Sequence, residues 1–192
     1  LTLVDVAQLV GRLPFDFAAS GADMAILSAH KLGGPKGIGA LVVRDGLGPW
    51  PLSAGGGQER GWRAGTEALA LAVGFGAAAT AAARDLAAGA WDEVEKLRKS
   101  LERTLSAEAS DLIIWDAEAP RLPNTSCLAL PGWRAETQGM QLDLAGFAVS
   151  AGAACSSGKV GPSRALRAMG ADETAAASAI RVSIGPTTTA AE

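Results

Sequence analysis

Three short apolar segments, each followed by polar or glycine-rich residues, limit most strongly what this chain can fold into. They are residues 1–4, 23–27 and 37–43. Apolar runs of this length bounded by turn residues predict strands, and helical segments between them predict an α/β sheet. Asp5 and Ser28 directly follow the first two runs. Because such sheets hold ligands at strand ends, we expect a site there.

The rest of the pattern divides the chain into two predicted domains, residues 1–90 and 91–192. A long ordered loop at 48–65 and an Ala-rich helix at 67–88 complete the first. An amphipathic helix starts the smaller second domain, because Trp91, Val94, Leu97, Leu101 and Leu105 recur at steps of three and four. Glu95 and Lys99 lie on its other face at the favourable i,i+4 spacing. We further expect helices at 6–10, 138–147 and 162–169, strands at 112–115, 125–130 and 180–184, and a small-residue loop at 150–158.

Composition excludes several classes of function. The net charge of −3 comes from 17 basic and 20 acidic residues without long blocks of either sign, which argues against nucleic-acid binding. No apolar run reaches the ~20 residues of a spanning helix, so we expect no membrane partner. Two cysteines are too few for a disulfide framework and favour a reducing cytoplasm. One histidine and two distant cysteines cannot form an intrinsic metal site.

The segment Ser28-Ala29-His30-Lys31 carries the first candidate chemistry. A lysine at a strand end, in an apolar and glycine-rich setting, loses its charge easily and becomes available to form a Schiff base. Ser28 and His30 lie two residues apart, so in extended backbone both side chains face the same side and could bind a phosphate. The alternative is that Lys31 is a solvated loop lysine and His30 a structural histidine.

Asp5 and Arg181 are candidates with equally ordinary alternatives. A pyridoxal ring needs a carboxylate beside its nitrogen, and Asp5 at a strand end could supply it, with Gln8 three residues on. Asp5 could equally cap a helix over 6–10. Arg181 interrupts an apolar strand and favours an anionic partner, either a substrate carboxylate or a structural salt bridge.

The two cysteines have different surroundings. Cys155 lies in Ser150-Ala151-Gly152-Ala153-Ala154-Cys155-Ser156-Ser157-Gly158, where every neighbour is small. Such a loop leaves a thiol reachable, as a nucleophile requires. Cys127 lies within a predicted strand and fits a buried, inert cysteine.

The order of these motifs resembles the cysteine desulfurases of the class V aminotransferase family. Its motifs are matched by Asp5–Gln8, Ser28–Lys31 with Gly34–Gly39, Gly55–Arg60 with Arg63–Glu67, Leu122–Thr125, the Cys155 loop and Ile180–Ser183. The resemblance covers essentially all 192 residues, and the Cys155 loop narrows it to the desulfurases. It implies a fold-type I pyridoxal-phosphate enzyme, with residues 1–90 belonging to the large domain and residues 91–192 to the small α+β domain.

The resemblance also implies roles for the cofactor residues. Lys31 would bind pyridoxal phosphate covalently and later remove the α-proton of the substrate. Asp5 would pair with the ring nitrogen and Gln8 with the ring hydroxyl, while Ser28 and His30 would hold the phosphate.

Three further residues receive roles from the same resemblance. Thr66 would reach the phosphate of the other subunit in a homodimer, and Arg181 would bind the carboxylate of L-cysteine. Cys155 would take the substrate sulfur as a persulfide, releasing L-alanine, and pass it to an acceptor such as an iron–sulfur scaffold. Cys155 would thereby transiently ligate an iron–sulfur cluster.

Two other readings of the sequence stay open. One is a related class V aminotransferase or selenocysteine lyase, and the other is a non-catalytic dimerisation or sulfur-relay fragment. The chain starts inside a strand-like run, and the family's earlier half is missing from it. We therefore interpret it as part of a longer polypeptide and expect the isolated chain to be inactive.

Overall fold

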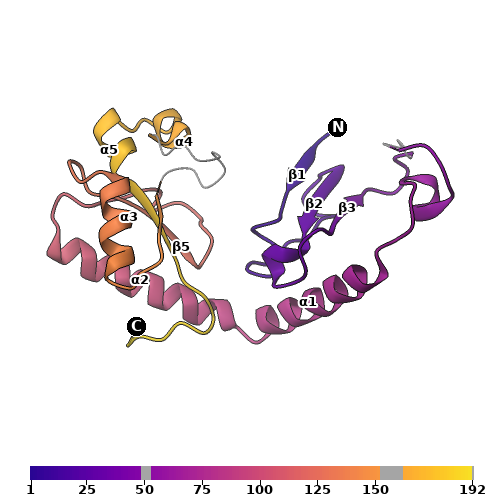
Figure 1. Cartoon of the computed structure of the whole chain (residues 1–192), viewed down its shortest axis with the longest axis horizontal. Coiled ribbons are helices and arrows are strands. Elements are labelled where there is room, and N and C mark those ends of the chain that lie inside the picture. Colours follow the sequence, from indigo (N-terminus) through magenta and orange to yellow (C-terminus); the bar gives the residue numbers. More distant parts are fainter. Residues whose placement is uncertain (49–52, 152–161, 192) are drawn as a thin grey trace. The chain divides into compact units, whose positions relative to one another are not determined.

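The computed structural model describes residues 1–48, 53–151 and 162–191. The chain forms two compact units, Leu1–Ala90 and Trp91–Glu192. Each unit has its own sheet (Figure 1).

Unit 1 is built on a three-stranded sheet in the order β1-β2-β3. β1 (Leu3–Asp5) runs parallel to β2 (Met24–Ser28), and β2 is antiparallel to β3 (Gly39–Val43). All three predicted strands are confirmed within two residues. The buried Asp23 carboxylate accepts a hydrogen bond from the Thr2 amide at 2.7 Å and pairs with Arg44 at 2.6 Å. It therefore holds the starts of β1 and β2 beside the end of β3.

A long helix, α1 (Leu69–Ala87), packs against the segment that follows β2. The contact uses small residues one turn apart. A Cβ on Gly74 would lie 3.1 Å from Pro35, and the Ala78 side chain lies 3.1 Å from where Gly34 would carry one. Glycine at these positions lets the helix approach the loop closely. By length and composition alone α1 could cross a bilayer, a criterion that core helices of soluble proteins also meet.

Unit 2 is an antiparallel four-stranded sheet in the order β4-β5-β7-β6. Its strands are β4 (Ile113–Ile114), β5 (Thr125–Ala129), β6 (Ser150–Ala151) and β7 (Ala179–Ser183). Its helices are α2 (Ala90–Glu108), α3 (Ala135–Leu144), α4 (Arg164–Ala168) and α5 (Glu173–Ser178).

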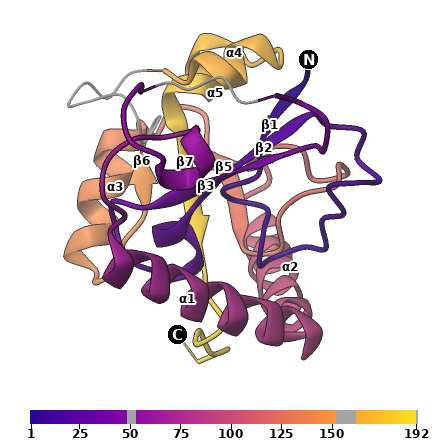
Figure 2. The same cartoon turned by 90° about the vertical axis from the view of Figure 1, so that its right-hand side faces the viewer.

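Apolar residues cover both faces of this second sheet. Leu128 and Ile180 point to one face, where Leu105 of α2 and Ala135 of α3 pack against them. On the other face Ala129 and Ala179 pack against Leu166 of α4, and α4 lies beside α5 (Figure 2). Alternation along β5 and β7 therefore also assigns Cys127 and Arg181 to the face covered by α4.

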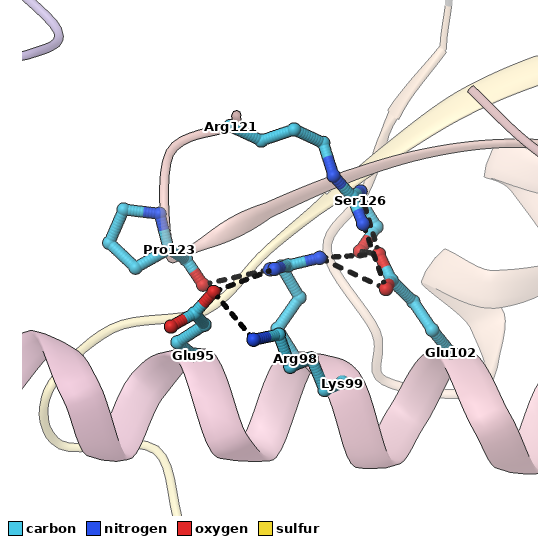
Figure 3. A network of polar contacts seen from close by, with 7 residues as sticks. All are labelled: Glu95, Arg98, Lys99, Glu102, Arg121, Pro123 and Ser126. Carbon is cyan, nitrogen blue, oxygen red and sulfur yellow. Dashed lines mark hydrogen bonds and ion pairs between the residues drawn. The ribbon is translucent and has the colours of Figure 1, made fainter. Parts of the chain in front are cut away.

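A buried polar network ties α2 to β5 (Figure 3). The Glu102 carboxylate accepts hydrogen bonds from Arg98 at 2.8 and 2.9 Å, from Arg121 at 2.9 and 3.1 Å, and from the Ser126 hydroxyl at 2.5 Å. Arg98 also donates to the Pro123 carbonyl at 3.0 Å. The network fixes the entry of the chain into β5.

Several predicted elements are wrong in position or kind. Residues 6–10 form hydrogen-bonded turns rather than a helix, and the turns continue through Gly11, whose φ of 81° is not helical. The helix predicted at 138–147 spans Ala135–Leu144, and it ends before residue 147 because the left-handed Gly146 stops it. The 3₁₀ helix η1 (Ala29–Leu32), the 3₁₀ helix η2 (Gln58–Gly61), α5 and β6 were not expected from the sequence pattern.

Candidate active site

The carboxyl ends of β1 and β2 meet at one edge of the first sheet. Asp5 ends β1 and Ser28 ends β2. The two strands are parallel, with Asp5 opposite Ile26, and the Val6 amide donates to the Ile26 carbonyl at 3.1 Å. Parallel strands present their carboxyl ends at the same edge, which is where α/β sheets bind ligands. The two strand ends that were predicted to carry the site therefore lie side by side, and the binding of a ligand there stays a prediction.

Ser28 and His30 do meet, although by a different route from the one predicted. Ser28 Oγ lies 2.8 Å from His30 Nδ1. The expected extended backbone is wrong beyond Ser28, because residues 29–32 form η1. Ala29 is fully buried and its amide donates to the Ile38 carbonyl at 3.1 Å, which anchors this turn. A hydroxyl and an imidazole thus stand together beside the exposed Lys31.

Asp5 has the local hydrogen bond of a cap. Its Oδ1 accepts from the Ala7 amide at 2.9 Å, although turns rather than a helix follow. Asp5 and Gln8 are both exposed, and the Gln8 carbonyl accepts a hydrogen bond from Arg12. A carboxylate that caps a turn keeps acceptor capacity for a second donor. The pairing of Asp5 and Gln8 with a pyridoxal ring stays a prediction.

Thr66 is exposed in the segment between η2 and α1. The preceding loop is held by Arg63, which donates to the Gly65 carbonyl at 2.8 Å and pairs with Glu59 at 3.6 Å. Glu59 and Arg60 both have positive φ, at 49° and 55°. Non-glycine residues adopt this conformation rarely, and it is concentrated at functional segments. The role of Thr66 across a dimer stays a prediction.

Arg181 occupies the centre of a row of side chains in unit 2. It is paired with Cys127 of β5 on one side and with Ser150 of β6 on the other, and directly opposite residues share a face of the sheet. Within residues 1–48, 53–151 and 162–191, Arg181 forms no ion pair. The structural salt bridge considered above therefore has no partner in the described part of the chain.

Cys127 lies in β5, as predicted, and burial raises the pKa of its thiol, partly offset by the charge of Arg181. A thiol of this kind is a poor nucleophile at neutral pH. Cys155 lies outside the described residues. The strand β6 that precedes it ends at Ala151, next to β7. Among the residues the structure describes, no group of three His, Cys, Asp or Glu side chains could hold a metal ion.

One residue near the site, Arg12, was not predicted from the sequence. Arg12 contacts both the Gln8 turn and η1. The sequence does contain a feature that indicates such a role. Arg12 is a single charged residue in the otherwise apolar run Leu9–Leu13, next to a glycine. An arginine in such a run needs buried acceptors.

Comparisons with known proteins agree with this geometry. The aminotransferase class-V family model matches residues 1–192. The cysteine desulfurase of Cereibacter sphaeroides is 45% identical over 188 residues, covering 98% of this chain and 48% of that protein. The IscS-like cysteine desulfurase of Mycobacterium tuberculosis is 39% identical, with 98% and 48% covered. The chain thus spans about half the length of the curated relatives it matches.

Solved structures give the same result. A NifS-like protein from Rickettsia africae superimposes with a TM-score of 0.86 at 32% identity, covering 98% of this chain and 49% of that one. SspA in complex with cysteine superimposes with a TM-score of 0.71 at 29% identity, covering 97% and 51%. These neighbours confirm the fold-type I assignment. Since the family model spans every residue, the chain belongs to the class V aminotransferase family, whose members named cysteine desulfurase depend on pyridoxal phosphate.

Proposed function

We propose that this chain supplies the lysine-bearing and cysteine-bearing half of a pyridoxal-phosphate-dependent cysteine desulfurase. The main support is one edge of the first sheet, where Asp5 ends β1 and Ser28, His30 and Lys31 lie at and just after the end of β2, with Ser28 Oγ 2.8 Å from His30 Nδ1. Relatives at 39–45% identity that are named cysteine desulfurases support the same activity.

The residues at this edge fit the cofactor by their chemistry. When bound, pyridoxal phosphate supplies an electrophilic carbon and an electron-withdrawing ring. The hydroxyl of Ser28 and the ring of His30 donate to a phosphate, and the Asp5 carboxylate suits a protonated ring nitrogen. The primary amine of Lys31 is exposed at the same edge and can form the covalent bond to the cofactor. Lys31 Nζ is then the base for the α-proton of the substrate.

Arg181 and the segment after β6 supply the sulfur chemistry. Arg181 is the candidate partner of the L-cysteine carboxylate, which a guanidinium binds through two parallel hydrogen bonds. The solved structure of SspA with cysteine supports this class of substrate. Cys155 follows Ser150 by five residues. Covalent geometry therefore keeps it within about 18 Å of Ser150, which is paired with Arg181.

The sulfur transfer needs no further oxidant or reductant. The Cys155 thiolate forms an S–S bond with the substrate sulfur while the bond between that sulfur and Cβ breaks. The carbon keeps the bonding electron pair, takes a proton and leaves as L-alanine, and Cys155 is left as a persulfide.

The proposal includes partners of the assembled enzyme. A homodimer would bring Thr66 of one subunit to the phosphate of the other, and an acceptor protein such as an iron–sulfur scaffold would take the sulfur in the cytoplasm. Exposed apolar side chains of unit 1, Leu3 and Leu41 on the sheet and Leu69 and Val73 on α1, support packing against further polypeptide.

Sulfide release tests the proposal. Because the chain spans only about half the length of its relatives, the assay uses a chimera. In it, the preceding half of the Cereibacter sphaeroides protein is joined to Leu1. With L-cysteine and a thiol reductant, Cys155→Ala should abolish sulfide and alanine formation while the cofactor stays attached. Cys127→Ala is the matched control and should retain both products. Unchanged sulfide release by Cys155→Ala would overturn the desulfurase assignment and favour an aminotransferase or selenocysteine lyase.

A further inference from the structure

The guanidinium of Arg12 connects two backbone segments of the candidate site. Its Nη1 donates to the Gln8 carbonyl at 2.7 Å, and its Nη2 donates to the Lys31 carbonyl at 3.1 Å. Gln8 and Lys31 belong to different turns, one after β1 and one after β2. A single planar group therefore bridges the two turns.

The Lys31 carbonyl needs such a partner. It lies in the last turn of η1, which is only four residues long and ends at the left-handed Gly33. No N–H group within a helix is available to donate to its final carbonyls. In short 3₁₀ helices the hydrogen-bond geometry is also poor. A cation at this end is favourable, because the helix dipole is negative there.

The turn after β1 is shaped to bring Arg12 to this position. Gly11 has φ at 81°, and a Cβ placed on it would lie 2.8 Å from Leu32 Cδ2 and 3.0 Å from the Ala82 side chain. Only glycine satisfies both the conformation and the contact. The turn is closed by hydrogen bonds from the amides of Arg12 and Leu13 to the Leu9 carbonyl at 3.0 and 3.1 Å. The side chain of Arg12 thus lies against η1, where it donates to the Lys31 carbonyl. Burial lowers the pKa of its guanidinium.

We propose that Arg12 is a positioning residue that locks the Lys31 turn to the Gln8 turn. The inference rests on the proposed function in taking Lys31 as the cofactor-binding lysine. Partial desolvation strengthens the two charge-assisted hydrogen bonds, so the lock holds the Lys31 backbone in place before any ligand arrives. Arginine suits this task better than lysine, because its donors diverge in one plane toward two acceptors.

Hydrogen exchange of the chain without cofactor tests the lock. Arg12→Met keeps the aliphatic stem and removes the donors, and Arg12→Lys keeps the charge. The matched control is Arg84→Met, since Arg84 lies on α1 of the same unit with its side chain 78% exposed. In Arg12→Met the amides of Gly33 and Gly34, which donate to the Ala29 carbonyl, should exchange about 10-fold to 100-fold faster. Arg12→Lys should rescue part of this protection, and Arg84→Met should match the parent chain.

A second readout addresses the lysine itself. The chain is treated with pyridoxal phosphate and borohydride, and the label on Lys31 is compared with that on Lys36, the neighbouring lysine of the same loop. Arg12→Met should lower the ratio of Lys31 to Lys36 labelling about tenfold. Unchanged exchange and an unchanged ratio in Arg12→Met would overturn the lock. Faster exchange combined with labelling of a lysine other than Lys31 in the parent chain would sustain the lock and refute the proposed function.

Discussion

Glu102→Gln should destabilise unit 2 by an amount far above that of an ordinary surface substitution. Glu102 accepts two hydrogen bonds from Arg98, two from Arg121 and one from Ser126. The neutral amide keeps the shape but leaves two guanidinium groups without their shared carboxylate. Breaking a buried ion pair in this way costs about 3–5 kcal/mol.

The structure places the expected cost at the lower end of that range. Arg98 is buried but keeps Glu95 at 3.5 Å and the Pro123 carbonyl at 3.0 Å. The side chain of Arg121 is 14% exposed, so water can solvate part of its charge. We therefore expect a loss of about 3 kcal/mol, which corresponds to an opening equilibrium about 150-fold larger.

The assay is native-state hydrogen exchange of β5 and β7 amides, read by mass spectrometry. Glu93→Gln is the matched control, because Glu93 lies on the same helix and pairs only with the exposed Lys96, at 2.6 Å, among described residues. Its effect should stay within about 0.5 kcal/mol. A destabilisation of less than about 1 kcal/mol in Glu102→Gln would show that the buried ion pairs of Glu102 contribute little to the stability of unit 2.

The same network predicts a pH dependence. Burial alone would raise the pKa of Glu102, but the hydrogen bonds from Arg121, Ser126 and Arg98 outweigh it and hold the pKa below its ordinary value. A lowered pKa in the folded state means that the contribution is complete above the unfolded pKa of about 4.3 and is lost as the pH falls through the folded value. The gap between the parent chain and Glu102→Gln should therefore shrink below about pH 4.

Three further substitutions have defined outcomes. In the chimera, Arg181→Gln should lower kcat/KM for L-cysteine about 10-fold to 100-fold, as the loss of a charged hydrogen-bond pair predicts; an unchanged value would exclude Arg181 as the carboxylate partner. Gly11→Ala should lower the melting temperature of unit 1, because a Cβ would lie 2.8 Å from Leu32 and φ is positive; an unchanged temperature contradicts this packing. Gln138→Leu should cost unit 2 about 1–3 kcal/mol in urea unfolding, because Gln138 donates to the Ser178 carbonyl at 2.7 Å; equal midpoints would refute that role.

The three strands of unit 1 could be predicted from sequence because each is a short apolar run bounded by turn residues. β6 could not, because Ser150-Ala151 has no strand pattern and exists only by pairing with β7. α5 was missed because six mostly small residues give no periodicity, although Asp172 caps it through the Ala175 amide at 2.7 Å. Tertiary pairing decides such short elements.

Side-chain partners were partly predictable. The Glu95–Lys99 pair is confirmed at 2.9 Å, because i,i+4 spacing on an exposed helix face is sufficient to define it. Arg98 and Glu102 have the same spacing but are buried, and nothing in the helix itself identifies Arg121 or Ser126 as their partners. Arg121 and Ser126 reach Glu102 only because the folded chain places β5 and the loop before it beside α2.

Peptide mapping shows directly whether Lys31 binds the cofactor. The chimera is loaded with pyridoxal phosphate, reduced with borohydride and digested, and the phosphopyridoxyl group is located by mass spectrometry. We expect the group on Lys31 and no adduct on that peptide in Lys31→Ala. The matched control, Lys36→Ala, should keep the adduct on Lys31. A label on another lysine in the parent protein, or a stable adduct that persists in Lys31→Ala, would show that Lys31 is not the cofactor-binding lysine.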